Sequence, residues 1–398
     1  MSAAPLRICS PHCGVNPETT SGGETYEREL LVRLGQAGAR VELILARGKP
    51  HPEGVPNWTV HRFPIGRGLR WYVAPFVVPA AVKRVHDQAG FDVLRVHSLR
   101  YIGPGALWAR RRYGLDAPVV SHHHHLDRSP LNRLIEKRVI EASEHVITVS
   151  EFSRRQLVDE LGVAVDHVSV IHNGVDERFA PGARDGALAE RLGVGSRPTT
   201  LFLGGLKARK NVDLLLEVWP RVLPLVPGAV LLIAGAGPLE QAFRQKAAEL
   251  GLGGSVIFSG RVAEEEKVRF YQIADLFVSP SSLEGFGLSV AEAMSCGLPV
   301  LVANRGALPE LTGGGVGAAV FDPGKPQELV EGVAGFLRSQ ERRAEGGRAN
   351  RARIDAFFRW DRAVSKVREV YGETLSRWRR VHPRTRSATS SARVGGRS

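Results

Sequence analysis

Residues 279–310 have the sequence SPSSLEGFGLSVAEAMSCGLPVLVANRGALPE, which predicts a strand end, a glycine loop, a helix and a further strand in succession. An apolar run over 274–278 precedes them and is typical of a buried strand in a parallel sheet. Residues 288–296 contain good helix formers, and Gly297 stands where a C-terminal cap is expected. Together with an apolar strand at 300–303, this pattern indicates an α/β domain.

The glycine loop before this helix is suited to bind a phosphate or diphosphate. Its two glycines let a ligand approach the backbone closely. The first amides of the helix have no internal partners and lie at the positive end of the helix dipole.

Two carboxylates, Glu284 and Glu292, flank the loop. A carboxylate repels phosphate, so both are better placed to accept hydrogen bonds from hydroxyl groups of a sugar and of a ribose. The alternative is an ordinary strand-to-helix turn whose glutamates are only solvated.

Glu284, followed eight positions later by Glu292 with Gly-Phe-Gly between them, resembles the E-x7-E signature of retaining glycosyltransferases of family 4. The resemblance extends to about Tyr371 and implies the GT-B fold, in which two doubly wound Rossmann-like α/β domains face each other across a cleft. It implies a first domain at 1–180, a nucleotide-sugar-binding domain at 197–355 and a terminal helix at 356–378 that crosses back. The donor-binding residues implied in this stretch are Gly285, Phe286, Gly287, Leu288 and Glu292.

The chain begins with a predicted strand–helix–strand unit whose first crossing carries Gly22 and Gly23. Open α/β sheets bind ligands at such crossings, although a glycine pair alone is common in turns. The resemblance places these glycines against the donor diphosphate and the acceptor.

Four consecutive histidines, His122 to His125, follow a predicted strand that begins after Pro118. In the family, such a strand ends in one histidine at the sugar site, and His124 fits that place best, with His123 second. A metal site is an alternative, but no further ligands with fixed spacing stand nearby. The histidines could also be solvated or belong to the core.

A second predicted phosphate-binding element is the loop after the strand at 200–203. The family has an arginine where this chain has Gly205, whereas Lys210 matches the phosphate-binding lysine. Lys207 and Arg209 remain as candidates to replace the arginine, and Lys210 itself could be an ordinary surface lysine.

The chain of 398 residues has a formal net charge of +13, and the seven arginines from Arg377 onward contribute about half of it without any acid. Phosphorylated donors and anionic membrane surfaces suit this charge, whereas no nucleic-acid motif is visible. Residues 379–398 are expected to form a disordered basic tail, which either contacts a membrane or only aids solubility. Three cysteines and no visible signal peptide favour a cytoplasmic protein, in peripheral contact with the inner membrane face if the tail binds there.

The resemblance predicts a hexosyltransferase-type enzyme that moves a sugar from a nucleotide diphosphate-sugar to an acceptor hydroxyl of a glycan, glycolipid or small molecule, with retention of configuration and without a cofactor. The Asp-x-Asp motif of metal-dependent glycosyltransferases is absent, so metal independence is expected. His124 and Glu284 are the implied catalytic residues, and a diphosphate oxygen is the implied base.

Two other classes of protein remain as alternatives. A dinucleotide-dependent oxidoreductase would need a complete G-x-G-x-x-G fingerprint, which the segment Gly235-Ala236-Gly237-Pro238 does not provide. A nucleotide-sugar-binding protein without catalysis is supported only by the departure at Gly205.

Overall fold

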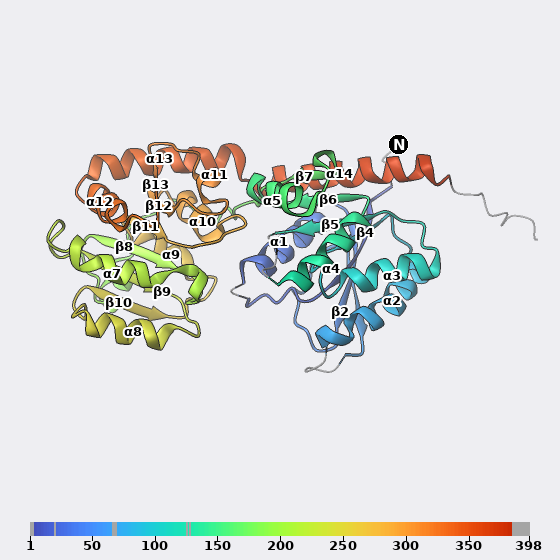
Figure 1. Ribbon diagram of the computed structural model, residues 1–398, viewed down its shortest axis with the longest axis horizontal. Coiled ribbons are helices and arrows are strands. Elements are labelled where there is room, and N and C mark those ends of the chain that lie inside the picture. The colour runs from blue at the N-terminus through green and yellow to red at the C-terminus, as the bar shows by residue number, and fades with distance from the viewer. Residues whose placement is uncertain (1–3, 20, 66–69, 125, 127–128, 384–398) are drawn as a thin grey trace, which may run out of the picture.

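The computed structural model describes residues 4–19, 21–65, 70–124, 126 and 129–383, and it shows two α/β domains side by side (Figure 1). Each domain is built on one sheet whose strands all pair in parallel, with helices on its faces. The predicted fold class of two doubly wound Rossmann-like domains is confirmed.

The first sheet has the strand order β3-β2-β1-β4-β5-β6-β7. The order reverses between β1 and β4, and open α/β sheets bind ligands at the carboxyl ends of the strands beside such a reversal. The elements are β1 Arg7–His12, α1 Gly22–Gln36, β2 Arg40–Ala46, β3 Trp58–Phe63, α2 Arg70–Gln88, β4 Val93–Val96, α3 Gly103–Tyr113, β5 Val119–His123, α4 Pro130–Glu141, β6 His145–Thr148, α5 Glu151–Leu161 and β7 Val168–Val170.

The second sheet has the order β10-β9-β8-β11-β12-β13, so its reversal lies between β8 and β11. The loops that leave these two strands are those with Lys210 and Glu284, which explains why the two segments meet. The elements are α6 Gly186–Arg191, β8 Thr199–Leu203, α7 Val212–Val222, β9 Val230–Ala234, α8 Glu240–Glu249, β10 Val256–Gly260, α9 Lys267–Gln272, β11 Leu276–Ser279, α10 Leu288–Ser295, β12 Val300–Ala303, α11 Leu308–Thr312, β13 Ala318–Phe321, α12 Pro326–Leu337, α13 Gln340–Phe357 and α14 Trp360–Val381.

The predicted strand–loop–helix–strand unit around the glycine loop is confirmed. The strand runs over Leu276–Ser279, the helix over Leu288–Ser295 and the next strand over Val300–Ala303. All residues of both strands are buried, as expected for a sheet covered on both faces. Gly297, with φ +78°, has the left-handed conformation that ends such a helix.

The chain crosses between the domains twice, once before α6 and once between α13 and α14. The two crossings lie against each other, because Val175 N donates to Phe358 O at 2.8 Å. Gly174 permits this approach, since a Cβ there would lie 2.4 Å from the ring of Trp360.

Helix α14 packs along the first domain and points away from the second (Figure 1). Tyr371 is fully buried there, and Trp378 Nε1 donates to Asp116 at 2.9 Å. The helix continues to Val381, past the expected end at 378, and Arg379 in its last turn forms an ion pair with Asp92 at 3.0 Å. The predicted disordered tail therefore begins too early, and its residues 384–398 lie outside the described part of the chain.

Among the described residues, none of the helices combines the length and the apolar character that a membrane crossing requires.

Candidate functional site

The glycine loop ends directly at the N-terminus of α10. Gly287 is the N-cap, with φ +99° and ψ +53°, and a Cβ at this position would lie 2.7 Å from Leu308 Cδ2. Glycine is therefore required both by the backbone conformation and by packing. The loop also contacts Gly306, whose absent Cβ would lie 2.4 Å from the carbonyl oxygen of Glu284.

The residues of this loop that are predicted to bind the donor differ in their exposure to solvent. Phe286 is 5 % exposed, and its ring packs against Phe358 and His172 with centroids 5.7 Å and 6.4 Å apart. Its side chain is part of the packing between the segments, so only its backbone can face a ligand. Gly285 and Leu288 are partly exposed at the start of the helix.

Glu284 and Lys210 form the centre of the phosphate-binding candidate. Lys210 Nζ lies 2.5 Å from Glu284 Oε1, and Arg209 Nη1 lies 3.3 Å from Oε2. Burial alone would raise the pKa of Glu284, but these two cations lower it, so the carboxylate is ionised near neutral pH. Two cations thus lie beside the N-terminus of α10, an arrangement suited to a diphosphate.

Arg209 is one of the two candidates to replace the arginine missing at Gly205. Arg209 lies in the same short turn as Lys210, contacts the same carboxylate and also donates to Leu283 O at 3.1 Å. Its side chain is 46 % exposed and can turn toward a ligand. Lys207 lies close to Gly205, since its Cε would be 3.9 Å from a Cβ added there.

Glu292 lies in the second turn of α10 and is almost fully buried. Its Oε2 accepts from Tyr271 OH at 2.7 Å and its Oε1 from Lys267 Nζ at 3.3 Å. Burial raises the pKa of Glu292, and Lys267 opposes this effect. Sequence reasoning missed Tyr271 and Lys267, because neither belongs to a motif.

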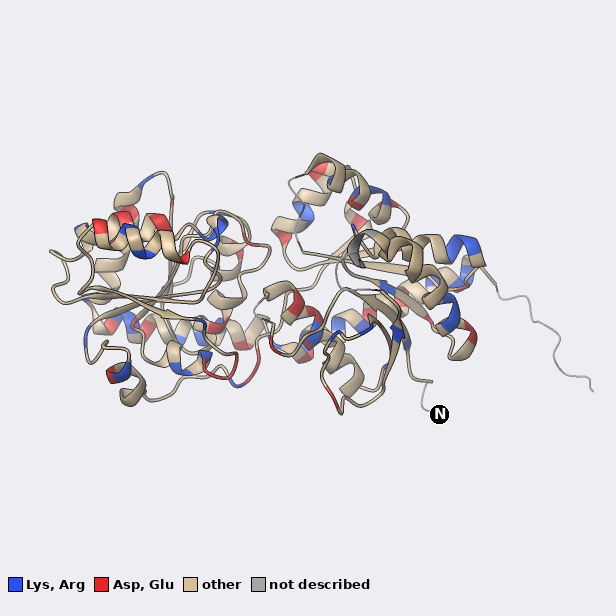
Figure 2. Cartoon of the chain, turned by 90° about the horizontal axis from the view of Figure 1, so that it is seen from below, with Lys and Arg blue, Asp and Glu red and all other residues tan. Residues whose placement is uncertain are grey.

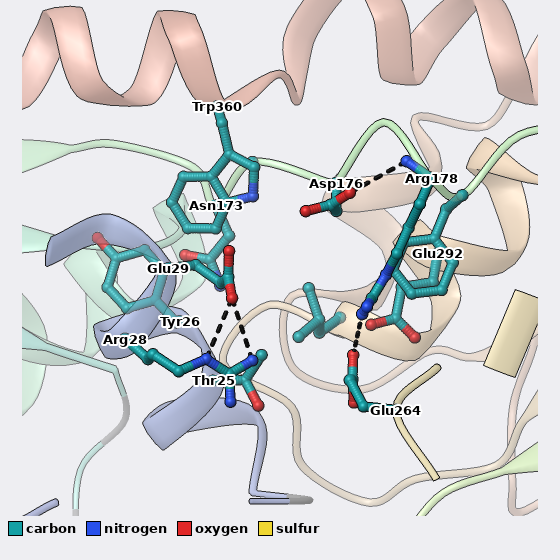
Figure 3. Close-up of a pocket in the computed structure, with 13 residues that line it drawn as sticks. Thr25, Tyr26, Arg28, Glu29, Asn173, Asp176, Arg178, Glu264, Glu292 and Trp360 are labelled. Atoms are coloured by element: carbon teal, nitrogen blue, oxygen red, sulfur yellow. Dashed lines mark hydrogen bonds and ion pairs between the residues drawn. The ribbon is translucent and has the colours of Figure 1, made fainter. Parts of the chain in front are cut away.

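Figure 3 shows a pocket between the two domains, lined by residues of α1, of the segment after β7 and of α10. Glu292 points into it from the second domain, and Tyr26 and Arg28 face it from the first. Trp360 from the start of α14 closes one side. The pocket reaches the predicted ribose-binding glutamate, whereas Glu284 is not one of its lining residues.

Gly22 and Gly23 form the first turn of α1 rather than a separate loop. A Cβ at either position would meet nothing within 4 Å, so packing does not require glycine there. The two glycines therefore leave room beside the backbone of this turn for a ligand.

The histidine run divides into members with different partners. His122 Nε2 lies 2.7 Å from Tyr371 OH, and burial lowers its pKa well below the usual value. His124, just after β5, lies with Nε2 3.1 Å from Glu27 Oε1. His123 is buried at the end of the strand, and His125 lies outside the described residues.

Sequence reasoning also missed Glu27 and the residues around it. Glu27 has 0 % exposed surface and contacts His12, Arg95, His97 and His124. These partners stand at three different strands, β1, β4 and β5, so only the folded chain brings them together.

Two family models cover most of the chain. The model described as Glycosyltransferase Family 4 matches residues 20–179, and the model described as glycosyl transferases group 1 matches residues 188–353. These two regions contain the histidine run and the E-x7-E signature, respectively.

Similar proteins have glycosyltransferase names. The GDP-mannose-dependent alpha-(1-6)-phosphatidylinositol monomannoside mannosyltransferase of Mycobacterium tuberculosis is 31 % identical over 62 % of this chain and 67 % of its own length. The D-inositol 3-phosphate glycosyltransferase of Mycolicibacterium smegmatis is 30 % identical over 78 % of this chain and 74 % of its own length. Sucrose-phosphate synthase from Thermosynechococcus elongatus shares the fold, with a TM-score of 0.78 at 20 % identity over 94 % of this chain and 100 % of that one.

The fold and the cation-lined glycine loop define an enzyme of the nucleotide-sugar-dependent hexosyltransferase type. The chain belongs to the group 1 glycosyltransferases of family 4.

Proposed function

We propose that this protein transfers a hexose from a nucleotide diphosphate-sugar to an acceptor hydroxyl, with retention of configuration and without a metal ion. The observation that carries the proposal is the arrangement of Lys210 and Arg209 around Glu284, beside the N-terminus of α10. These groups can stabilise the charge that develops on a leaving diphosphate. A diphosphate needs such stabilisation whichever sugar it carries.

In the proposed reaction, the bond between the anomeric carbon and a diphosphate oxygen breaks while the acceptor oxygen bonds to the same face of that carbon. The acceptor proton passes to the departing diphosphate, so no side chain has to act as the base. Glu284 and His124 would hold sugar hydroxyls, and Glu292 would accept from the ribose. Glu284 suits this role because it is ionised and can only accept hydrogen bonds.

A screen of GDP-mannose, UDP-glucose and ADP-glucose tests the proposal. GDP-mannose appears in the name of a relative. UDP-glucose was bound in the structure of Anabaena HepE, which shares the fold at a TM-score of 0.76. A matching donor at a hundred times its Kd should stabilise the folded protein by about 2.7 kcal/mol. The same donor should be slowly hydrolysed or transferred. Stabilisation without any turnover would instead support a nucleotide-sugar-binding protein that has lost catalysis.

Activity is expected to persist in the presence of EDTA. The sequence has no Asp-x-Asp motif, and the cations that face the glycine loop are side chains. The measurement is turnover before and after exhaustive chelation, with a matched sample to which each divalent metal is returned. Loss of activity that a single metal restores would contradict the proposal.

Replacing Glu292 by alanine is expected to weaken donor binding by about 1.5–3 kcal/mol, because a charged acceptor for the ribose is removed. Calorimetry of donor binding measures the effect. The matched control is Glu217→Ala, which removes a glutamate of α7 that is 55 % exposed and pairs with Lys246. Unchanged donor affinity in a folded Glu292→Ala protein would exclude the ribose assignment.

We also propose peripheral contact with anionic membranes on the cytoplasmic side. Lys and Arg residues gather where the chain leaves α14 (Figure 2), and Arg110 of α3 lies 5.5 Å from the ring of Trp378. Residues 384–398 add four arginines and no acid. Each basic residue near an anionic surface contributes about 1 kcal/mol of binding.

Removal of residues 384–398 is therefore expected to release the protein from anionic vesicles at lower salt, with unchanged turnover on a soluble acceptor. A chain of full length with the four arginines replaced by glutamine is the matched control and should behave like the shortened chain. Equal vesicle binding by all three proteins would mean that the tail only aids solubility.

A further inference from the structure

The side chain of Glu27, in the second turn of α1, is fully enclosed by donors. His12 Nε2 lies 3.2 Å and Arg95 Nη2 2.5 Å from its Oε2. His97 Nδ1 lies 3.3 Å and His124 Nε2 3.1 Å from its Oε1. The His12 and His124 contacts are hydrogen bonds, whereas those of Arg95 Nη2 and His97 Nδ1 are ion-pair contacts without hydrogen-bond geometry.

The ionisation of Glu27 is set by these neighbours. Burial alone would raise its pKa, but Arg95 and the histidines hold the pKa well below the usual value. Arg95 has 0 % exposed surface, so the two charges are a buried ion pair. The carboxylate is therefore an acceptor only, and its charge favours a proton on each histidine nitrogen that faces it.

The tautomer of His12 follows from a backbone contact. Gly14 N donates to His12 Nδ1 at 3.1 Å, so Nδ1 carries a lone pair and the proton is on Nε2. His12, Glu27 and His97 have residue types and distances that could hold a metal ion. A protonated Nε2 cannot ligate a metal, and the guanidinium of Arg95 already balances the carboxylate, so the cluster is a hydrogen-bonded network rather than a metal centre.

The charge of Glu27 favours opposite tautomers in the other two histidines, through a hydrogen bond to His124 and through an ion-pair contact without hydrogen-bond geometry to His97. His124 presents Nε2 to Glu27 and His97 presents Nδ1. Burial lowers the pKa of both, so each ring is neutral near pH 7. Their other nitrogens, Nδ1 of His124 and Nε2 of His97, consequently carry lone pairs.

The rings that carry these two nitrogens are partly accessible. The side chains of His97 and His124 are 17 % and 16 % exposed, whereas those of Glu27 and Arg95 are fully buried. Within the described part of the chain, no hydrogen bond occupies either nitrogen. The two rings meet edge to face with centroids 5.4 Å apart.

The cluster belongs to the ligand-binding edge of the first sheet. His12 ends β1, His97 follows β4 and His124 follows β5, so all three stand at carboxyl ends of strands beside the reversal of strand order. The ring of Tyr26, which lines the pocket between the domains, lies 4.9 Å from that of His124.

We propose that Glu27 is a positioning residue that fixes His97 and His124 as a pair of hydrogen-bond acceptors, and that their unprotonated nitrogens bind hydroxyl groups of a sugar or another polyol substrate. This proposal rests on the proposed transferase function. It adds His97 to the substrate-binding residues and gives the buried carboxylate a role. A site of this kind discriminates strongly against a substrate in which one of the bound hydroxyls is missing.

Long-range ¹⁵N–¹H NMR of the histidine rings in the free, full-length protein tests the proposal without any substrate. His124 should carry its proton on Nε2 and His97 on Nδ1, with assignments from His97→Gln and His124→Gln. A proton on His97 Nε2 or on His124 Nδ1, or a doubly protonated ring, would overturn the proposal. If the protein shows the predicted tautomers but binds no nucleotide-sugar, the proposed transferase function is refuted, whereas the hydrogen-bonding arrangement around Glu27 is supported.

Glu27→Gln provides the second test, because an amide carries no charge and its nitrogen donates where the carboxylate only accepts. In this variant, His97 and His124 should no longer show the predicted tautomers, and kcat/KM should fall on the order of tenfold or more. Glu42→Gln is the matched control, since Glu42 holds His61 at 2.6 Å on the neighbouring strands β2 and β3. It should leave kcat/KM and the rings of His97 and His124 unchanged.

Substrate analogues separate a binding role from a structural one. His97→Leu should raise KM for a hydroxyl-bearing substrate on the order of tenfold, and His97→Gln, which retains an acceptor oxygen, should restore part of the loss. A deoxy analogue that lacks the bound hydroxyl should be used equally by wild type and His97→Leu. Equal losses for every analogue, in a folded protein, would contradict hydroxyl recognition by His97.

Discussion

Replacing Lys210 by methionine is expected to lower kcat on the order of 10²–10³-fold, the usual loss when one preorganised group that stabilises developing charge is removed. Lys210 Nζ lies 2.5 Å from Glu284 in the structure, beside the N-terminus of α10. We expect it to move from the carboxylate to the diphosphate when a donor binds. The effect should be large because Gly205 leaves the loop without the arginine found in the family.

The measurement is kcat at saturating donor and acceptor. Lys246→Met is the matched control, because Lys246 belongs to the same domain but pairs with Asp213 and Glu217 on the surface of α7. Arg209→Gln should give a smaller loss than Lys210→Met, since Arg209 is 46 % exposed. A Lys210→Met enzyme with nearly normal kcat would mean that other groups balance the leaving diphosphate.

Replacing Arg95 by methionine is expected to destabilise the protein by about 3–5 kcal/mol at neutral pH, the loss typical when one partner of a buried ion pair is removed. The change leaves Glu27 buried without its guanidinium partner at 2.5 Å. Urea unfolding measures the loss. Arg62→Met, which removes an exposed arginine bonded to Ala46 O and Lys49 O, should cost about 1 kcal/mol or less.

The pH dependence of this difference follows from the lowered pKa of Glu27. A carboxylate whose pKa is lower in the folded state stabilises the fold above its unfolded pKa, about 4.3, and this contribution is lost as the pH falls. The gap between wild type and Arg95→Met should therefore be largest at neutral pH and shrink below about pH 4.3. A gap that is constant over this range would show that packing of the arginine, rather than its charge, is responsible.

The second domain could be predicted in detail because its signals are local. The glycine loop, the helix after it and the cap at Gly297 occupy one continuous stretch, and the structure has them within a few residues of the predicted positions. Gly22 and Gly23, which the sequence placed at the crossing from strand to helix, belong to the first turn of the helix itself. Glycine pairs usually indicate a turn, but here they are accommodated in the first helical turn, where a Cβ would meet nothing within 4 Å.

The network around Glu27 could not be predicted, because its energy comes from contacts between distant segments. Arg95 stands in the middle of a short apolar strand, where a charged side chain would ordinarily count against burial. Glu27 stands on a helix whose neighbouring positions carry charged residues as well. Only the folded chain shows that these two charges neutralise each other inside the protein.

The double crossing between the domains has a consequence for exchanging parts between related enzymes. Residues 360–381 belong to the first domain by their contacts, since Tyr371 bonds to His122 and Trp378 to Asp116, although they follow the second domain in the chain. A chimaera that imports a different second domain therefore needs two junctions, one near residue 180 and one near residue 358. Because Val175 bonds to Phe358, the two junctions lie next to each other in space and have to be matched as a pair. A single-junction exchange would combine α14 of one enzyme with the first sheet of another and leave His122 facing a foreign helix.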